Sequence, residues 1–206
     1  MSTPLDSVRD DLAFMRSIVE GGSSFARSFG RAYFLGGVCY GVQMILHGGQ
    51  ALNWIPPLPL LNLAIGLGPT VVFLALLSVL LWRDRGGLPG GHIPRTIGAA
   101  FSAVGLANLS LIVVIGSVAW RQHSLTIWLI YPCAVFVLQG AAWFVVYGIR
   151  HKPVMLAIAL AWMASGIAMA LLITQLGLYL LILGVAMLLL MVLPGWAMMR
   201  NAPSLA

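Results

Sequence analysis

Charged side chains are scarce in this sequence: aspartate, glutamate, lysine and arginine together make up only 8% of its 206 residues. A typical soluble domain carries about 25% charged residues, because its surface must face water. Hydrophobic residues make up 61% of the chain, which excludes a disordered chain as well. The composition therefore predicts an integral membrane protein.

Cysteine is almost absent too. The two cysteines, Cys39 and Cys133, lie inside separate apolar runs, where a thiol usually serves as a small packing residue. This excludes a disulfide-stabilised scaffold. A secretory signal peptide is not expected either, because most of the acidic residues of the chain lie within its first 20 residues.

Charge is missing from the middle of every long apolar run. Proton-coupled pumps and cation channels need an ionisable group along their path, and hydrolytic enzymes need an acid or base at the reacting centre. We therefore expect no enzymatic activity, no catalytic residue, no metal site and no cofactor. The net charge of +6 comes from basic residues that stand singly near the ends of the runs, so nucleic acid is not expected as a partner.

Six runs are long enough to cross a membrane as helices, since about 20 apolar residues span its hydrocarbon core. They lack the alternation of a membrane β-strand. The expected fold is all-α. It is a six-helix transmembrane bundle over 30–200, preceded by a cytoplasmic amphipathic helix and linker over 1–29 and followed by a tail over 201–206. The spans are expected near 30–52, 59–82, 96–120, 125–148, 153–174 and 177–199.

The distribution of lysine and arginine predicts which side of the membrane faces the cytoplasm. Arg121 is the only basic residue expected on one side, and all the others are expected on the opposite side. Basic residues are enriched in cytoplasmic loops, so we expect both termini in the cytoplasm, with the protein in an inner or plasma membrane. Aromatic residues are expected to mark the interfaces: Trp54, Trp120, Trp128 and Tyr179 outside, and Tyr33, Trp82, Tyr147 and Trp196 inside.

Residues 4–20 are expected to form a separate amphipathic helix, which begins in a capping pattern at Thr3-Pro4-Leu5-Asp6 and ends at Gly21-Gly22. The polar face carries more acidic than basic residues, which weakens binding to an anionic lipid surface. The helix can dock on its own bundle, on a partner chain or on the membrane. Its apolar face follows a spacing of three and four residues: Leu5, Val8, Leu12, Met15 and Val19.

Uncharged polar side chains occur near the middle of several spans. Counting 1.5 Å per residue places Gln43, Asn108 and Gln139 within about 7 Å of one plane. Thr70 lies at a similar depth, just after the kink expected at Pro69. Two interpretations stay open: these four polar residues bind an uncharged or lipophilic small molecule, or the amides form hydrogen bonds between helices.

Small residues four apart predict close packing of helices. Gly37 and Gly41 have this spacing in the first span, and Ala157, Ala161 and Ser165 repeat it in the fifth. Such residues let two helix backbones approach each other, either within one chain or between chains.

The leading hypothesis is a non-enzymatic scaffold or accessory subunit in the lipid bilayer. It packs against other membrane chains, or against a second copy, through Gly37, Gly41 and the apolar stripe of the N-terminal helix. One alternative is a channel or facilitator for an uncharged or lipophilic small molecule, built on the four midplane residues. Another is a subunit of a membrane redox or enzyme complex.

Overall fold

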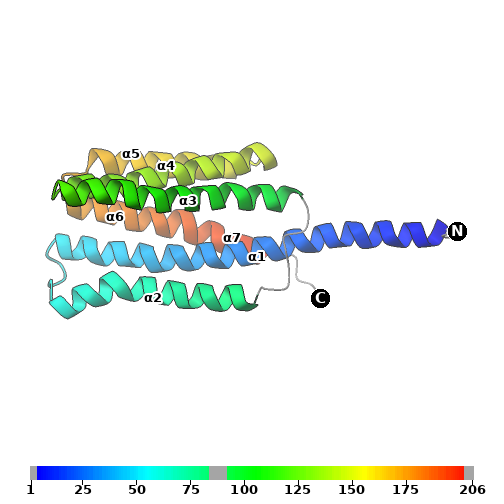
Figure 1. The fold of residues 1–206 in the computed structure, drawn as a ribbon, viewed down its shortest axis with the longest axis horizontal. Coiled ribbons are helices and arrows are strands. Elements are labelled where there is room, and N and C mark those ends of the chain that lie inside the picture. The colour runs from blue at the N-terminus through cyan, green and yellow to red at the C-terminus, as the bar shows by residue number, and fades with distance from the viewer. Residues whose placement is uncertain (1–3, 84–91, 202–206) are drawn as a thin grey trace.

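The chain folds into a bundle of long helices (Figure 1). The computed structural model describes the backbone of residues 4–83 and 92–201, and the side chains of 26–80, 82–83 and 93–200. Within these ranges every regular element is a helix, which confirms the all-α class. In chain order the elements are α1 (Pro4–Ala51), α2 (Pro59–Arg83), α3 (His92–Arg121), α4 (Leu125–Arg150), α5 (Pro153–Leu171), α6 (Leu176–Met187), the π-helical turn η1 (Leu188–Val192) and α7 (Leu193–Asn201).

Five helical segments of the described chain are long and apolar enough to cross a membrane, and they correspond to five of the expected spans. The expected span over 30–52 is not among them, because Gln43, His47 and Gln50 lower its hydropathy. That half of α1 nevertheless lies inside the bundle, against α2, α3, α6 and α7. The five segments are Pro59–Leu80, Ile93–Arg121, Leu125–Arg150, Pro153–Leu171 and Leu176–Arg200.

α1 is one continuous helix of 48 residues. The expected helix end at Gly21-Gly22, and the linker expected after it, are therefore wrong. Glycine lowers helix propensity by only about 1 kcal/mol per residue, so the helical residues on either side carry the backbone through. The N-terminal half of α1 continues past the end of the bundle and does not fold back on it (Figure 1). The side chains of the predicted apolar stripe lie outside the described residues: Leu5, Val8, Leu12, Met15 and Val19.

Facing glycines bring α1 close to α6 and α7. A Cβ atom added to Gly184 would lie 2.8 Å from the carbonyl oxygen of Gly41, and one added to Gly195 would lie 2.8 Å from that of Gly30. Gly30 and Gly41 are eleven residues apart on α1. Gly184 on α6 and Gly195 on α7 have the same separation, with η1 between them. Eleven residues make about three helical turns, so the same faces of the two helices meet twice.

Gly37 and Gly41 are both buried in this contact. A Cβ atom on Gly37 would lie 2.6 Å from Cβ of Met191, and one on Gly41 would lie 2.8 Å from Cγ of Leu188. The sequence left open whether this pair packs within one chain or between chains. In the structure the pair packs within the chain, so neither glycine is accessible to a partner.

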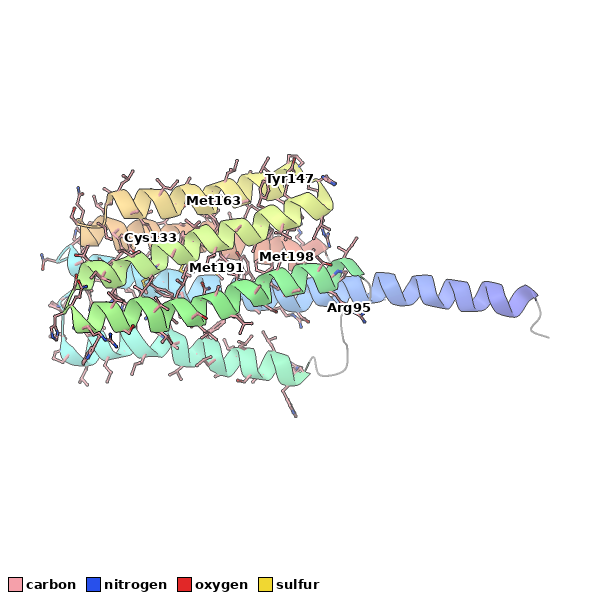
Figure 2. The ribbon with its side chains drawn as sticks, turned by 45° about the horizontal axis from the view of Figure 1, so that its top comes forward. Arg95, Cys133, Tyr147, Met163, Met191 and Met198 are labelled. Carbon is pink, nitrogen blue, oxygen red and sulfur yellow. The ribbon has the colours of Figure 1, made fainter. Side chains whose placement is uncertain are left out.

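α4 and α5 approach each other in the same way. A Cβ atom on Gly140 would lie 2.8 Å from the carbonyl oxygen of Ala159, and one on Gly166 would lie 3.1 Å from that of Cys133. Unbranched methionine side chains cover the glycines at both interfaces. Figure 2 labels the three methionines concerned: Met163 over Gly140, Met191 over Gly37 and Met198 over Gly30.

α2 and α3 lie at the edge of the bundle. α2 packs substantially only against α1, while α3 packs against α4 and more weakly against α1. In the most apolar 18-residue stretch of each of these helices, only 6% of the residues are buried, compared with 39% in α4. In a membrane, the apolar surfaces of these two helices face lipid.

Replacing Gly184 with alanine should destabilise the bundle, because the new methyl group would meet the Gly41 carbonyl oxygen at 2.8 Å. Overpacking of this kind costs about 1–3 kcal/mol, measurable as the free energy of unfolding in mixed micelles with tryptophan fluorescence as the signal. Gly105→Ala is the matched control, since a Cβ atom there meets no described atom within 4 Å. The control should be at least as stable as the wild type, and equal losses in both variants would contradict the role of the glycine contact.

Candidate functional site

The polar residues predicted to share one plane lie at separate places in the bundle. Gln43 is buried between α1 and α2, where its Nε2 donates to the carbonyl oxygen of Gly66 at 2.9 Å. Thr70 lies one turn further along α2. Gln139 instead lies between α4 and α1, with its Nε2 at 3.5 Å from the hydroxyl of Tyr33.

Gln43 and Gln139 do not lie at one level in the bundle. Tyr33 and Gln43 are ten residues apart on α1, about 15 Å along the helix axis. Because Gln139 reaches Tyr33, the two glutamines lie at different levels and contact different neighbours. Asn108 lies on α3, and its Oδ1 is buried without a hydrogen-bond partner among the described atoms. The structure therefore brings Gln43 and Thr70 to one interface and leaves Asn108 and Gln139 on other helices.

The proline kink in α2 explains the position of Gln43. Pro69 has no N–H, so the carbonyl of Ile65 loses its helical donor and the turn before the proline opens. The amide of Gln43 donates to the next carbonyl of that turn, which belongs to Gly66. Inside a membrane, carbonyls exposed by a kink must be satisfied by neighbouring helices. Gln43 therefore links α1 to α2 beside Pro69, while its Oε1 is buried without a hydrogen-bond partner among the described atoms.

α4 shows the same arrangement at Pro132. The hydroxyl of Tyr179, which is 0% exposed, donates to the carbonyl oxygen of Leu129 at 2.7 Å. Leu129 stands three residues before Pro132, just as Gly66 stands three residues before Pro69. In both helices, a polar side chain from another helix thus donates to the carbonyl three residues before the proline.

A second polar cluster surrounds the hydroxyl of Tyr33. Trp143 donates to this oxygen through Nε1 at 2.8 Å, and Nε2 of Gln139 lies 3.5 Å from it. The indole of Trp162, which is 1% exposed, lies beside the same hydroxyl. A hydroxyl oxygen can accept only two hydrogen bonds, and Nε1 of Trp162 has no hydrogen-bond partner among the described atoms.

Aromatic rings close this cluster on the side of α3. Phe29 stacks on Tyr33 with ring centroids 5.5 Å apart. Phe101 of α3 lies 4.7 Å from Phe29 and 5.8 Å from Trp143, also between centroids. Phe29 was expected in a linker and is instead a helical residue packed against the core. Together these side chains provide hydrogen bonds and aromatic packing between α1, α3 and α4.

Two aromatic residues expected at the membrane interfaces lie in the core. Tyr33 is 6% exposed and Tyr179 is fully buried. Each hydroxyl has a hydrogen-bond partner on another helix, which allows a tyrosine near the end of a span to turn inward. Trp54, Trp82 and Trp120 are all exposed, as interface residues should be.

The histidines near the helix ends take part in turns and local hydrogen bonds. Nδ1 of His47 lies 3.1 Å from Oε1 of Gln50. The same glutamine donates through Nε2 to Oδ1 of Asn62 at 2.6 Å. His123 and His151 adopt left-handed backbone conformations, with φ of 48° and 51°, in the turns after α3 and α4. Within the described residues, no group of three or more His, Cys, Asp or Glu could hold a metal ion.

Comparison with known proteins assigns this chain to no group. No protein-family model, curated protein or solved structure matches it. A functional interpretation must therefore start from the chain's own residues.

Replacing Gln43 with leucine should weaken the contact between α1 and α2, because the Gly66 carbonyl would lose its donor. A hydrogen bond between membrane helices contributes about 0.6–2 kcal/mol, and we expect the free energy of unfolding to fall by that amount. Pro69→Ala restores an N–H to α2, so Gln43→Leu should cost less in that background. An equal cost with and without Pro69 would show that the kink does not create the need for Gln43.

Substitutions of Tyr33 and Trp143 should have non-additive effects on the free energy of unfolding. Tyr33→Phe and Trp143→Phe each remove the 2.8 Å hydrogen bond, so the double variant should lose less than the sum of the single losses. The expected coupling is about 0.5–3 kcal/mol in the free energy of unfolding. Trp196→Phe is the control, since Trp196 is exposed and its effect should add to that of Tyr33→Phe. Simple additivity for the first pair would rule out a cooperative bond.

Proposed function

We propose that this chain is a non-enzymatic scaffold or accessory subunit of a membrane, and that it binds partner chains through the N-terminal half of α1. The observation that supports this function is the continuity of α1. One helix of 48 residues is packed inside the bundle along its second half and extends beyond the bundle along its first half (Figure 1). We call the extending half, residues 4–25, the arm. A continuous helix anchored in this way holds the arm in a defined direction.

The second half of α1 is the central element of the bundle. Among its described side chains, from Ala26 onward, only Arg31, Val42 and Ala51 are exposed. Facing glycines fix it against α6 and α7, and α2 and α3 also contact it. Because protein rather than lipid surrounds this segment, it can cross the membrane with Gln43 in its middle. We therefore propose it as the sixth span.

We place the arm in the cytoplasm, next to an inner or plasma membrane. Arg121 ends α3 at the end of the bundle away from the arm (Figure 1). The other basic side chains that the structure describes lie at or near the opposite end, and an excess of Lys and Arg is typical of the cytoplasmic side. They are Arg27, Arg31, Arg83, Arg95, Arg150, Lys152 and Arg200.

The expected partner is a different chain with an amphipathic helix. The arm's predicted apolar stripe suits such a helix, while its acidic polar face disfavours an anionic lipid surface. A second copy is less suitable, because other helices of the bundle surround α1. Two copies in one membrane would therefore hold their arms apart.

The geometry gives less support to a channel or facilitator for an uncharged molecule. That function needs Gln43, Thr70, Asn108 and Gln139 around one path, and the structure distributes them over different interfaces. A subunit of a redox or enzyme complex is one form of the proposed function, in which a partner chain provides the chemistry.

Deleting residues 4–20 should release partner chains that copurify with the full-length protein from its native membrane in a mild detergent. Leu12→Ser, on the predicted stripe, should release the same chains, because it removes apolar surface from the docking face. Mass spectrometry of the gel-filtration peak would identify and quantify them.

Ala13→Ser provides the matched control, since it introduces the same side chain next to the stripe. It should keep the partners bound. All three variants should keep the unfolding stability of the bundle, because the glycine contacts begin at Gly30. A single-chain species that is identical in the wild type and all variants would count against the proposal.

A further inference from the structure

The predicted apolar stripe of the arm lies on the side of α1 that packs inside the bundle. The backbone of α1 is one helix from Pro4 onward, so positions around its axis can be compared along its whole length. Residues 18 apart complete about five turns and lie in the same direction from the axis. Stripe positions match buried residues in this way: Leu12 with Gly30, Val19 with Gly37 and Met15 with Tyr33.

The helix that covers this face inside the bundle is α7, and it ends near the base of the arm. A Cβ atom on Gly195 of α7 would lie 2.8 Å from the carbonyl oxygen of Gly30, and α7 ends six residues later, at Asn201. Because α7 runs opposite to α1 (Figure 1), its end is level with about residue 24 of α1. The stripe begins about 7 Å beyond that level and extends for about 21 Å.

A second copy of this chain does not fit along the stripe. Two copies in one membrane have the same orientation, so their α1 helices run parallel. α1 is continuous over 48 residues, and a second arm placed on this face would continue into the position that α7 occupies. The geometry therefore favours a helix of a different chain, which ends or turns before it reaches the bundle.

Lipid is not a suitable occupant either. The arm continues the direction of a helix that lies inside the bundle, and it leads away from the apolar surfaces of α2 and α3 rather than along them (Figure 1). A helix that binds the membrane surface lies in the plane of that surface instead.

Arginine flanks the stripe on one side. Arg9 and Arg16 directly follow the stripe positions Val8 and Met15, which places both arginines on the same flank, seven residues apart. Charged residues at such flanking positions select the partner of a two-helix contact by their sign. A partner helix that carries aspartate or glutamate opposite these two positions would form ion pairs with them.

The base of the arm is basic as well. Arg200 lies in the last turn of α7 and is exposed, at the end of the helix beyond which the occupant would lie. Only one of the four acidic residues of the arm, Asp11, flanks the stripe, and it lies on the side away from Arg9 and Arg16. The charges nearest to the occupant therefore favour acidic residues on it.

We propose that the arm binds an acidic amphipathic helix of a different chain, which lies along positions 5–19 in line with α7 and places carboxylates opposite Arg9 and Arg16. This inference rests on the proposed function of the arm, and it names the chemistry and the position of the partner segment. The partner extends beyond the bundle the same face of α1 that α7 covers within it.

The test places a photoreactive benzoylphenylalanine in the full chain, either at Leu12 on the stripe or at Asp10 on the far side of the helix. After illumination of native membranes, mass spectrometry would identify the cross-linked peptides, with isotope-labelled and unlabelled chains mixed to detect a second copy. We expect position 12 to cross-link several-fold more than position 10. The peptide should come from a different chain, with apolar residues three and four apart and aspartate or glutamate beside them.

Two double variants test the charges. Arg9→Gln with Arg16→Gln should reduce the cross-link from position 12 several-fold, because it removes both ion pairs. Ser17→Asp with Ser24→Asp changes the net charge by the same amount on the far side of the helix and should leave the yield unchanged. Neither pair reaches the glycine contacts, which begin at Gly30.

The outcomes separate this inference from the proposed function. A partner chain that cross-links at position 12 through a basic or uncharged peptide, or whose yield does not depend on the two arginines, would overturn the inference and leave the proposed function intact. Cross-links only to lipid or to a second copy, or no cross-link at all, would overturn both.

Discussion

The close contact of α1 with α6 and α7 is the constraint on which the rest of the structure depends. Lipid tails are as apolar as the helices, so burial of apolar surface cannot by itself hold membrane helices together. Close approach of backbones can, and the positions of Gly30, Gly41, Gly184 and Gly195 permit it. With α1 fixed there, Tyr33 lies beside Trp143 in the core, and the direction in which the arm leaves the bundle is determined.

Hydropathy is highest in the helices that face lipid and lower in the helix that protein surrounds. The run over 30–52 could be recognised in the sequence, but it is not among the five segments that are apolar enough to cross a membrane. The five segments that follow α1 could be located from their apolar runs because their exposed faces must suit hydrocarbon. The second half of α1 has few exposed side chains, so it tolerates Gln43 and His47 and has a weaker apolar signal. Local sequence also suggested an end at Gly21-Gly22. Two glycines lower helix propensity only modestly, so the helix continues through them when the residues on both sides are helical.

The hydrogen-bond partners of the polar side chains could not be predicted from the sequence either. Counting residues placed Gln43 and Gln139 near one plane, but in the fold they lie at different levels and on helix faces with different partners. Pro69 predicts a freed carbonyl at Ile65, but only the fold shows that Gln43 donates to the neighbouring carbonyl of Gly66. Tyr179 appeared to belong to the interface because it lies near the start of a span. Its hydrogen bond to the carbonyl of Leu129 depends on how α6 lies relative to α4, which no local pattern encodes.

These assignments change where a function can be sought. The donors of Gln43, Tyr179, Gln139 and Trp143 form hydrogen bonds between helices. The buried amide oxygens of Gln43, Asn108 and Gln139 have no hydrogen-bond partner among the described atoms. Features that internal packing does not use are better candidates for binding. The arm extends beyond the end of the bundle (Figure 1), and α5 and α6 pack loosely beside Ser165.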